Sequence, residues 1–490
     1  MMLDTGSSPQ SRIVWLIAVT TLARLVFAAS LGLGVDESYM VAAGRTISLG
    51  YFDHPPAAWI LSWGAAHLFG TEAPLAVRLP FIALFALSTW LMARLGEAVA
   101  DARAGLWAAV LLNLSPVFGI TGGSWVLPDG PLLCALLGAA LCLVHATAGR
   151  GFGWWCGAGL CAGLALAAKY SALLSIGGAF VYLLCDRGQR HWLRRPAPYA
   201  AMALALLVFS PVVLWNADHG WASFAFQGAR AVGLRFRPLM PLTTLLGEGL
   251  FVLPWIWAPM LVLLVRGLWS PVERLRADRL LACLAAPPIV AFALISGWSS
   301  QRVLFHWAAP GYLMLFPLLG RWVAAHRPAA WLRRAILGTA ALLVLAMAAV
   351  GLQTRFDWLG GGLVAMMRKD PTLEGIDWVS LRADLTARGL LPSGVLVGIP
   401  NWRDAGKIGY ALGPEVTVLC LSQDARQFGF AHPLAAYKGQ DVLLLSLAPT
   451  AMGAVFERVE ALPDSAVRHR GRLLQTVSVA RGYQFAGRAP

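Results

Sequence analysis

The sequence predicts an α-helical polytopic membrane protein with about eleven transmembrane helices and a small C-terminal α/β extracytoplasmic domain. Of its 490 residues 58% are hydrophobic and 13% charged, and the mean hydropathy is +0.64, as is typical of integral membrane proteins. Apolar runs approaching the roughly 20 residues of a membrane span recur over about the first 350 positions. After Arg355 the chain returns to ordinary polarity.

The apolar runs locate the individual spans. Several runs are short, so the number of helices carries an uncertainty of about two in either direction. We expect spans near residues 13–33, 75–95, 104–121, 130–148, 154–168, 171–185, 198–215, 241–265, 280–296, 307–323 and 335–352.

The formal charge of +14 is distributed as a topology signal rather than as a nucleic-acid surface. Arg gathers in three loops, Arg187–Arg195, Arg266–Arg279 and Arg321–Arg334, which alternate with Arg-poor loops. Short cytoplasmic loops of membrane proteins are enriched in Lys and Arg, and these arginines can also face anionic lipid headgroups. We therefore expect a multi-pass protein of the cell inner membrane with a cytoplasmic N-terminus and a retained first helix. With an odd number of helices, the C-terminal domain is periplasmic.

Two domains are expected. Residues 1–352 form the transmembrane domain with a first outer loop at 34–74, and residues 353–490 form the α/β domain. Short β-type runs at Val395–Ile399, Val416–Leu421 and Val442–Leu445 alternate with helical segments at Leu381–Arg388 and Trp402–Leu412. This alternation predicts a small α/β fold.

The first outer loop carries the most informative residues of the chain. Asp36 and Glu37 directly follow the first apolar run, with Tyr39 close by, and open a segment suited to a helix at the bilayer interface. Ionisable groups at a membrane mouth indicate a function. Adjacent helical positions point about 100° apart, so we expect Asp36 to react and Glu37 to support it. The alternative is that Asp36 only caps the helix.

A second motif, Tyr51-Phe52-Asp53-His54-Pro55-Pro56, follows in the same loop. Its two prolines exclude regular structure and favour an extended backbone at His54. Such a loop can hold Asp53 and His54 in fixed directions over a cavity. A plain Pro-turn at the bilayer surface is the alternative.

Further polar residues are expected on the same side of the membrane. Lys169 is the only Lys among the first 350 residues, and its compact ammonium suits a phosphate; a snorkelling Lys is the alternative. Asp129 lies in a Pro-Asp-Gly segment, which is as consistent with a turn between two spans as with a functional site. Arg302 and His306 could share a helical face, or they and Tyr312 could be interfacial anchors.

This mixture of carboxylates and cations favours a transfer reaction on a lipid phosphate. Cations hold the phosphate as charge develops on the leaving oxygen, and a carboxylate accepts the proton of the attacking hydroxyl. A transporter or flippase of lipid-linked sugars should instead bury charges at mid-membrane in broken helices. An O-antigen-type saccharide polymerase is the nearer alternative.

The order of these motifs resembles bacterial members of the protein-mannosyltransferase and aminoarabinose-transferase superfamily, which are GT-C glycosyltransferases (family 39-like). The resemblance runs from Asp36 to Tyr312, through Tyr-Phe-Asp-His-Pro-Pro, Pro-Asp-Gly-Pro, Ala-Lys-Tyr and His-Trp-x-x-Pro-x-Tyr, and extends more loosely over Asn401–Phe430. It implies an inverting hexosyl or pentosyl transferase at the periplasmic face. The implied donor is a polyprenyl-phosphate sugar, and the implied acceptor is a lipid, a glycan or a protein.

The resemblance also implies roles for individual residues. Asp36, supported by Glu37, is the catalytic base or orients the acceptor. Tyr51, Asp53 and His54 lie near the donor phosphate, to which Lys169 and Arg302 add charge. Aminoarabinose transferases have Lys in place of His54, which puts an aminoarabinose donor in doubt.

The acceptor side and the metal complete the implied site. Tyr39, Asp129, His306 and Tyr312 are the candidate acceptor or cavity residues. Some GT-C enzymes use a divalent metal such as Mg²⁺ or Mn²⁺. Asp36, Asp53 and His306 are the candidate ligands, and the sequence leaves metal dependence open.

Overall fold

The structure, a computed structural model, describes residues 8–230, 236–269, 276–299, 302–326, 330–359, 372–448 and 453–490. The chain divides into two compact units. The first comprises Met1–Leu25, Leu49–Ala58 and Leu79–Val344, and the second comprises Val26–Ser48, Trp59–Arg78 and Leu345–Pro490. Two pieces of the first outer loop therefore belong to the same unit as the C-terminal residues.

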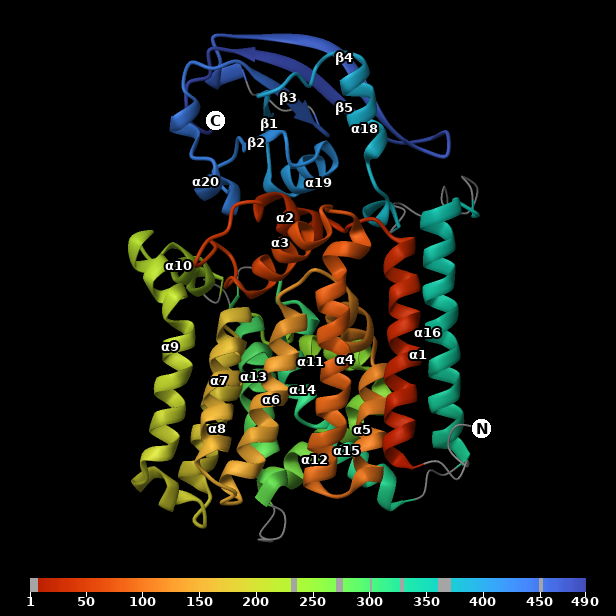
Figure 1. The fold of residues 1–490 in the computed structure, drawn as a ribbon, viewed down its shortest axis with the longest axis vertical. Coiled ribbons are helices and arrows are strands. Elements are labelled where there is room, and N and C mark those ends of the chain that lie inside the picture. The colour runs from red at the N-terminus through yellow and green to blue at the C-terminus, as the bar shows by residue number, and fades with distance from the viewer. Residues whose placement is uncertain are drawn as a thin grey trace. The chain divides into compact units, whose positions relative to one another are not determined.

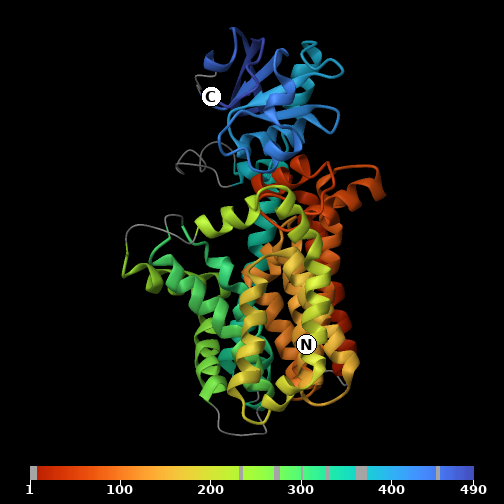
Figure 2. The same ribbon diagram turned by 90° about the vertical axis from the view of Figure 1, so that its left-hand side faces the viewer.

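The first unit is a bundle of helices whose long members run roughly parallel (Figures 1 and 2). Helices α1, α4 and α16 also contribute residues to the second unit. The helices of the bundle are α1 (Pro9–Ser30), α4 (Pro74–Val99), α5 (Ala102–Leu114), π-helix η1 (Val117–Gly122), α6 (Asp129–Thr147), α7 (Phe152–Ala168), α8 (Ala172–Cys185), η2 (Arg190–Arg194), α9 (Pro196–Asp218), α10 (Ala222–Ala229), α11 (Met240–Val252), α12 (Pro254–Trp269), α13 (Arg276–Ser296), η4 (Phe305–Ala308), α14 (Ala309–Leu313), α15 (Phe316–Ala325) and α16 (Ala330–Phe356).

The expected fold class, a multi-pass helical membrane protein, is confirmed. Each of the eleven predicted ranges overlaps a helix, although the count of eleven stays a prediction. In the part of the chain that the structure describes, six helices are long and apolar enough to cross a membrane, or seven if α11 and α12 form one bent span. That pair bends by 119° at Leu253, whose φ is +89°.

Small residues allow these helices to approach closely. A Cβ on Gly159 of α7 would lie 2.2 Å from the carbonyl oxygen of Ala201 in α9. Likewise, a Cβ on Gly178 of α8 would lie 2.0 Å from the carbonyl oxygen of Cys283 in α13. Such distances are too short for real atoms, so these contacts require glycine, as is common between membrane helices.

Ionisable side chains lie buried within the spans, among them Arg24 of α1 and Glu248 of α11. In α1, Arg24 donates hydrogen bonds to the carbonyl oxygen of Gly119 in η1 (2.9 Å) and to Oδ1 of Asn113 (3.0 Å). In α11, Glu248 is 1% exposed and accepts a hydrogen bond of 2.7 Å from the hydroxyl of Tyr312. Each of these groups replaces lost hydration by hydrogen bonds.

The second unit holds the acidic loop helix and the C-terminal α/β fold. Its elements besides the ends of α1, α4 and α16 are α2 (Val35–Ala43), α3 (Ala57–Phe69), η5 (Leu373–Gly375), α18 (Val379–Ala387), β1 (Leu396–Ile399), α19 (Trp402–Leu412), β2 (Thr417–Cys420), α20 (Gln427–Ala431), η6 (Leu434–Tyr437), β3 (Val442–Ser446), η7 (Gly453–Val455), β4 (Arg458–His469) and β5 (Arg472–Tyr483).

The sheet of this unit is mixed, with strand order β2-β1-β3-β5-β4. Strand β1 pairs in parallel with β2 and β3, whereas β5 pairs antiparallel with β3 and β4. The three predicted strands and the helix Trp402–Leu412 are present, and Asn401 caps that helix by accepting the N–H of Asp404 (3.0 Å). Sequence analysis missed the long hairpin β4–β5, whose burial pattern shows little regular alternation.

Candidate functional site

The two adjacent acids of the first loop have different surroundings. Helix α2 begins after Gly34, and Glu37 closes a capping box by accepting the N–H of Gly34 at Oε2 (3.0 Å). Asp36 is therefore not the cap, and its side chain is exposed within the second unit. The expected divergence of the two side chains is present, and it leaves Asp36 accessible to a reactant.

Glu37 is fully engaged by Arg78 of α4. The guanidinium donates from Nε to Oε1 (2.8 Å) and from Nη2 to Oε2 (2.6 Å). Its other hydrogen bonds go to the carbonyl oxygens of Ala28, Leu31 and Gly32 at the end of α1. Arg78 is 1% and Glu37 4% exposed. This buried pair fixes α2 against the ends of α1 and α4, so the structure gives Glu37 a positioning role.

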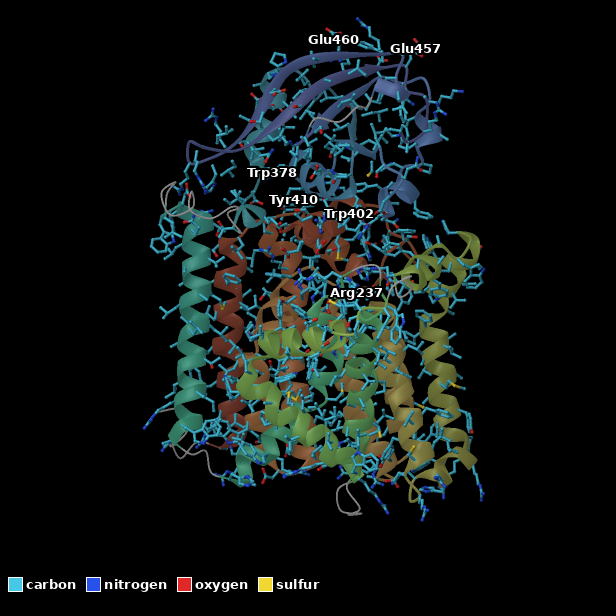
Figure 3. The ribbon with its side chains drawn as sticks, turned by 180° about the vertical axis from the view of Figure 1, so that it is seen from behind. Arg237, Trp378, Trp402, Tyr410, Glu457 and Glu460 are labelled. Carbon is cyan, nitrogen blue, oxygen red and sulfur yellow. The ribbon has the colours of Figure 1, made fainter. Side chains whose placement is uncertain are left out.

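Asp36 lies near two arginines of the C-terminal residues. Although Asp36 is exposed, neighbouring protein atoms partly desolvate its carboxyl and raise its pKa, while the guanidiniums of Arg403 and Arg426 oppose that rise. The guanidinium carbons of Arg426 and Arg403 lie 3.7 Å and 5.5 Å from the ring centroid of Trp402. Trp402 is the first residue of α19 and is labelled in Figure 3. The backbone of Arg426 is strained, with φ +47° and ψ −135°.

Tyr39 connects α2 to the same region. Its hydroxyl accepts the N–H of Gln427 (3.0 Å), and its ring meets those of Trp59 and Trp402 edge-on. A Cβ on Gly406 of α19 would lie 2.7 Å from Cα of Tyr39. The absence of a side chain at Gly406 therefore permits the contact between α2 and α19.

A buried lysine stabilises the same packing. Lys407 of α19 donates to the carbonyl oxygens of Leu33 (2.6 Å) and Glu374 (2.7 Å). Burial lowers its pKa to about 8. The acidic loop and the C-terminal residues are thus held together by specific polar contacts within the second unit.

The first unit brings together a second group of predicted residues. Lys169, at the end of α7, donates to both oxygens of Asp129 at the start of α6 (2.9 and 3.1 Å). His54 and His306 lie close enough to interact electrostatically with Asp129. Burial lowers the pKa of His306 to about 4, so its imidazole is neutral. We call Asp53, His54, Asp129, Lys169 and His306 the Asp129 cluster.

Asp53 belongs to this cluster because of how its loop is held. Tyr51–Pro56 has no helix or strand, as predicted. Helix α10 holds it: Gln227 donates to the carbonyl oxygen of Asp53 (2.5 Å), and the rings of Phe52 and Phe226 lie 4.7 Å apart. Asp53 interacts electrostatically with Tyr170, the residue after Lys169.

Three other predicted residues have different roles in the structure. Tyr51 is fully buried. Arg302 is exposed, lies 5.4 Å from the ring centroid of Phe305, and shares no helical face with His306, because η4 begins only at Phe305. The hydroxyl of Tyr312 lies between Glu248 (2.7 Å) and Nε1 of Trp257 (3.0 Å).

The Asp129 cluster and the Arg-rich loops lie at opposite ends of the bundle. Helices α6 and α7 are neighbours joined by a short turn, so the start of α6 and the end of α7 lie at the same end (Figure 1). Helix α8 leads from there to Asp186, which pairs with Arg279 (2.9 Å). The cluster is therefore a polar mouth of the bundle.

The described side chains form no recognisable metal site. Among them, no group of three or more His, Cys, Asp or Glu is arranged to hold a metal ion.

Comparison with solved structures defines the class of fold. The structure matches ArnT from Cupriavidus metallidurans bound to undecaprenyl phosphate with a TM-score of 0.67 at 16% identity, covering 96% of this chain and 98% of that one. It matches the apo state of the same protein with a TM-score of 0.68 at 15% identity, covering 99% and 100%. The fold is therefore that of ArnT.

The sequence adds a family match. Residues 53–215 match the dolichyl-phosphate-mannose-protein mannosyltransferase family, a segment that includes Asp53, His54, Asp129 and Lys169. The resemblance drawn from the motifs is thereby confirmed. No curated protein matches the chain.

Sequence analysis missed several residues of these two groups. Arg78 is a single charged residue inside an apolar run, a local signal that was overlooked. Arg403 and Arg426 fall in Asn401–Phe430, where the loose resemblance was the only indication. Glu248 is a single acid in an apolar run, which by itself indicates an intramembrane functional residue and could have been found.

Proposed function

We propose that this protein transfers a sugar from a polyprenyl-phosphate donor to a lipid, glycan or protein acceptor at the periplasmic face of the inner membrane. The observation that carries this proposal is the Asp129 cluster, a polar mouth on an apolar GT-C bundle. The family match and the fold support lipid-linked sugar transfer. The apolar helices provide the surface that a polyprenyl chain requires.

In this proposal Lys169 and His54 hold the donor phosphate. Two of the three N–H donors of Lys169 meet Asp129, which orients the ammonium and leaves a donor for a phosphate oxygen. His54 contributes a second donor, and Asp53 fixes the loop. Positive charge placed in advance stabilises the leaving phosphate as its charge develops.

We further propose that Asp36 is the base that accepts the proton of the acceptor hydroxyl. Its accessible carboxylate and the resemblance support this role, and the inverting outcome follows from direct attack of the hydroxyl on the sugar. Glu37 holds α2 in place.

Variants of the Lys169–Asp129 pair test the donor site. Lys169→Gln and His54→Ala should each weaken donor binding about tenfold to a hundredfold, because one charge-assisted contact to phosphate contributes about 1.5–3 kcal/mol. Asp129→Asn should retain donor binding, since Lys169 keeps its charge. The measurement is titration of purified protein with polyprenyl-phosphate sugar.

The control and the contrary outcome use the same titration. Arg194→Ala, in the exposed Arg-rich loop, should bind donor like the wild type. If Lys169→Gln and Asp129→Asn lower thermal stability equally while donor affinity per folded molecule is unchanged, the pair is structural and the donor site lies elsewhere.

The proposed topology has its own test. A reporter that is active only in the periplasm, fused after Pro490, should be active, because the Arg-rich loops are assigned to the cytoplasm. A matched fusion in the Arg187–Arg195 loop should be silent. Activity of the second fusion and silence of the first would reverse the proposed orientation.

One observation favours a second candidate, a transporter of lipid-linked sugars. The bent pair α11–α12 carries the buried Glu248, and broken helices with buried charge are typical of transporters. Reconstituted protein separates the two: an enzyme forms a glycosylated product in detergent without a second compartment, whereas a transporter requires sealed vesicles. A saccharide polymerase would instead extend its product by blocks of sugars.

A further inference from the structure

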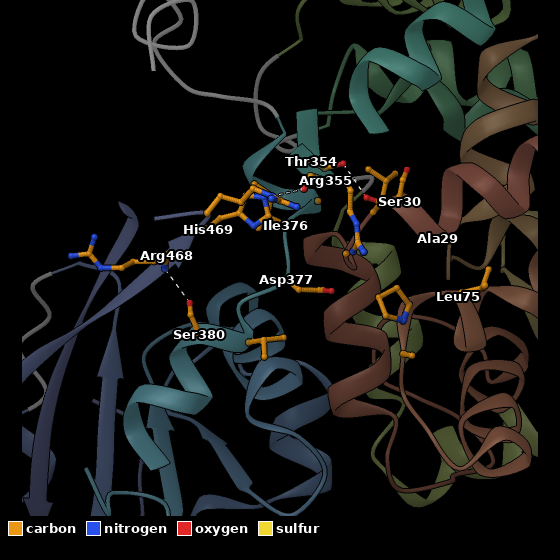
Figure 4. Close-up of a pocket in the computed structure, with 17 residues that line it drawn as sticks. Ala29, Ser30, Leu75, Thr354, Arg355, Ile376, Asp377, Ser380, Arg468 and His469 are labelled. Atoms are coloured by element: carbon orange, nitrogen blue, oxygen red, sulfur yellow. Dashed lines mark hydrogen bonds between the residues drawn. The ribbon is translucent and has the colours of Figure 1, made fainter. Parts of the chain in front are cut away.

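A cavity of about 700 Å³ lies within the second unit, apart from the residues assigned above to transfer. Its wall includes Ser30 at the end of α1, Leu75 at the start of α4 and Arg355 near the end of α16. The facing wall comes from residues 375–380 and from the turn of the hairpin β4–β5 (Figure 4). Because α1, α4 and α16 are candidate spans, the cavity lies at the level where membrane helices meet water.

The lining is amphipathic. Leu31, Leu75, Ile376 and Val379 supply apolar surface. The polar wall is ordered by hydrogen bonds: Thr354 donates to the carbonyl oxygen of Ser30 (3.1 Å). A volume of this size is typical of a small-molecule site, and the mixture suits a molecule with an apolar and a polar end.

Two guanidiniums of the lining are available to an anion. Nε of Arg470 donates to the carbonyl oxygen of Arg355 (3.0 Å), and its guanidinium lies 5.4 Å from the ring centroid of Phe356. Within the residues that the structure describes, neither Arg355 nor Arg470 forms an ion pair with a carboxylate. Guanidinium groups bind phosphate through paired N–H donors.

The same cavity has two buried polar atoms without a hydrogen-bond partner among the described residues. They are Oδ1 of Asp377 and Nε2 of His469. In Figure 4 the carboxylate of Asp377 points toward the residues of α1 and α4, on the cavity side. Buried polar atoms normally have partners, so both side chains have hydrogen-bonding capacity beyond the contacts that the described residues provide. A carboxylate accepts hydrogen bonds and therefore selects a donor such as an ammonium.

We propose that this cavity binds the headgroup of a phospholipid that carries both a phosphate and an ammonium, as phosphatidylethanolamine does. Arg355 and Arg470 bind the phosphate, Asp377 accepts hydrogen bonds from the ammonium, and His469 hydrogen-bonds a phosphate oxygen. The apolar wall accommodates the glycerol and the first methylenes of the acyl chains. The opposite charges of the lining match those of a zwitterion, whereas a purely anionic headgroup would place negative charge near Asp377 without offering it a hydrogen-bond donor.

The test is direct binding to delipidated, purified full-length protein, independent of sugar transfer. Water-soluble dihexanoyl-phosphatidylethanolamine, dihexanoyl-phosphatidylglycerol and inorganic phosphate are titrated separately. We expect phosphatidylethanolamine to bind most tightly. Arg355→Gln combined with Arg470→Gln should weaken it roughly tenfold to a hundredfold, as expected for lost charge-assisted contacts.

Two further variants make the test specific. Asp377→Asn should bring the affinities for the two lipids together, because only the ammonium distinguishes them at that position. Arg334→Gln, an exposed arginine at the opposite end of α16, should bind like the wild type. Since Asp377 lies near Lys407 and Arg78, its variant is compared only if its thermal unfolding matches the wild type. If it does not match, the double variant of the exposed Arg355 and Arg470 decides whether the cavity binds the lipid.

Three outcomes would overturn the proposal. Equal binding of the two lipids by the wild type would remove the role of Asp377. If inorganic phosphate bound as tightly as the lipids, the cavity would be an anion site only. Phosphatidylethanolamine binding unaffected by the double arginine variant would indicate surrounding bilayer lipid only.

Discussion

Asp36→Asn should lower the rate of sugar transfer by about 10²–10⁴, which is the usual contribution of a positioned general base. Asn keeps the size of the side chain but cannot accept the proton. Because Glu37 and Gly34, not Asp36, form the cap of α2, the variant should fold normally. The measurement is single-turnover transfer from a purified polyprenyl-phosphate sugar, with thermal unfolding followed in parallel.

Glu415→Gln is the matched control for Asp36→Asn. It makes the same carboxylate-to-amide change at an exposed position of the same unit, and it should transfer at the wild-type rate. An Asp36→Asn enzyme that is as fast as the wild type would remove Asp36 as the base. A normally folded variant that has lost donor binding as well would indicate that Asp36 acts on the donor.

Glu37→Gln should lower the free energy of unfolding by about 3–5 kcal/mol, the cost of breaking a buried ion pair. The variant leaves the guanidinium of Arg78 buried without its counter-charge and weakens a contact that joins α1, α2 and α4. The measurement is denaturant or thermal unfolding in detergent. Transfer per folded molecule should remain much closer to wild type than in Asp36→Asn.

The pair of Arg45 and Glu72 provides the control for burial. It has the same two-pronged geometry, at 2.9 and 2.8 Å, but both side chains are 18% exposed. Glu72→Gln should therefore cost about 1 kcal/mol or less. If Glu37→Gln were as stable as the wild type and yet abolished transfer, Glu37 would be a reacting group and the positioning role would be wrong.

The membrane architecture could be predicted because its cause is local. An apolar run of adequate length has to become a helix in the bilayer, where backbone groups must bond within the segment. All eleven predicted ranges overlap helices for this reason. The helix Trp402–Leu412 was predictable from another local signal, its Asn401 cap. The break between α11 and α12 was missed because continuous hydropathy carries no signal of a bend.

The candidate site could be predicted only in part. Asp53, His54, Asp129 and His306 were expected on one side of the membrane, and the fold brings them together around Lys169. That Lys169 is already paired with Asp129 was not predictable, since the two lie 40 residues apart and each suits a site or a turn by itself. Arg302 and His306 could have shared a helical face or served as interfacial anchors, and the first alternative is excluded because the described residues directly before η4 are not helical.

The sequence alone determined the class of protein, the apolar segments that become helices and the family it resembles. Composition, hydropathy and motif order are properties of the linear sequence, so they can be obtained without a structure. Only the tertiary structure showed how the surroundings of the adjacent acids Asp36 and Glu37 differ. That difference depends on Arg78, Arg403 and Arg426, which are distant in sequence. Packing brings them to α2, and their charges then bury one carboxylate in an ion pair and leave the other accessible.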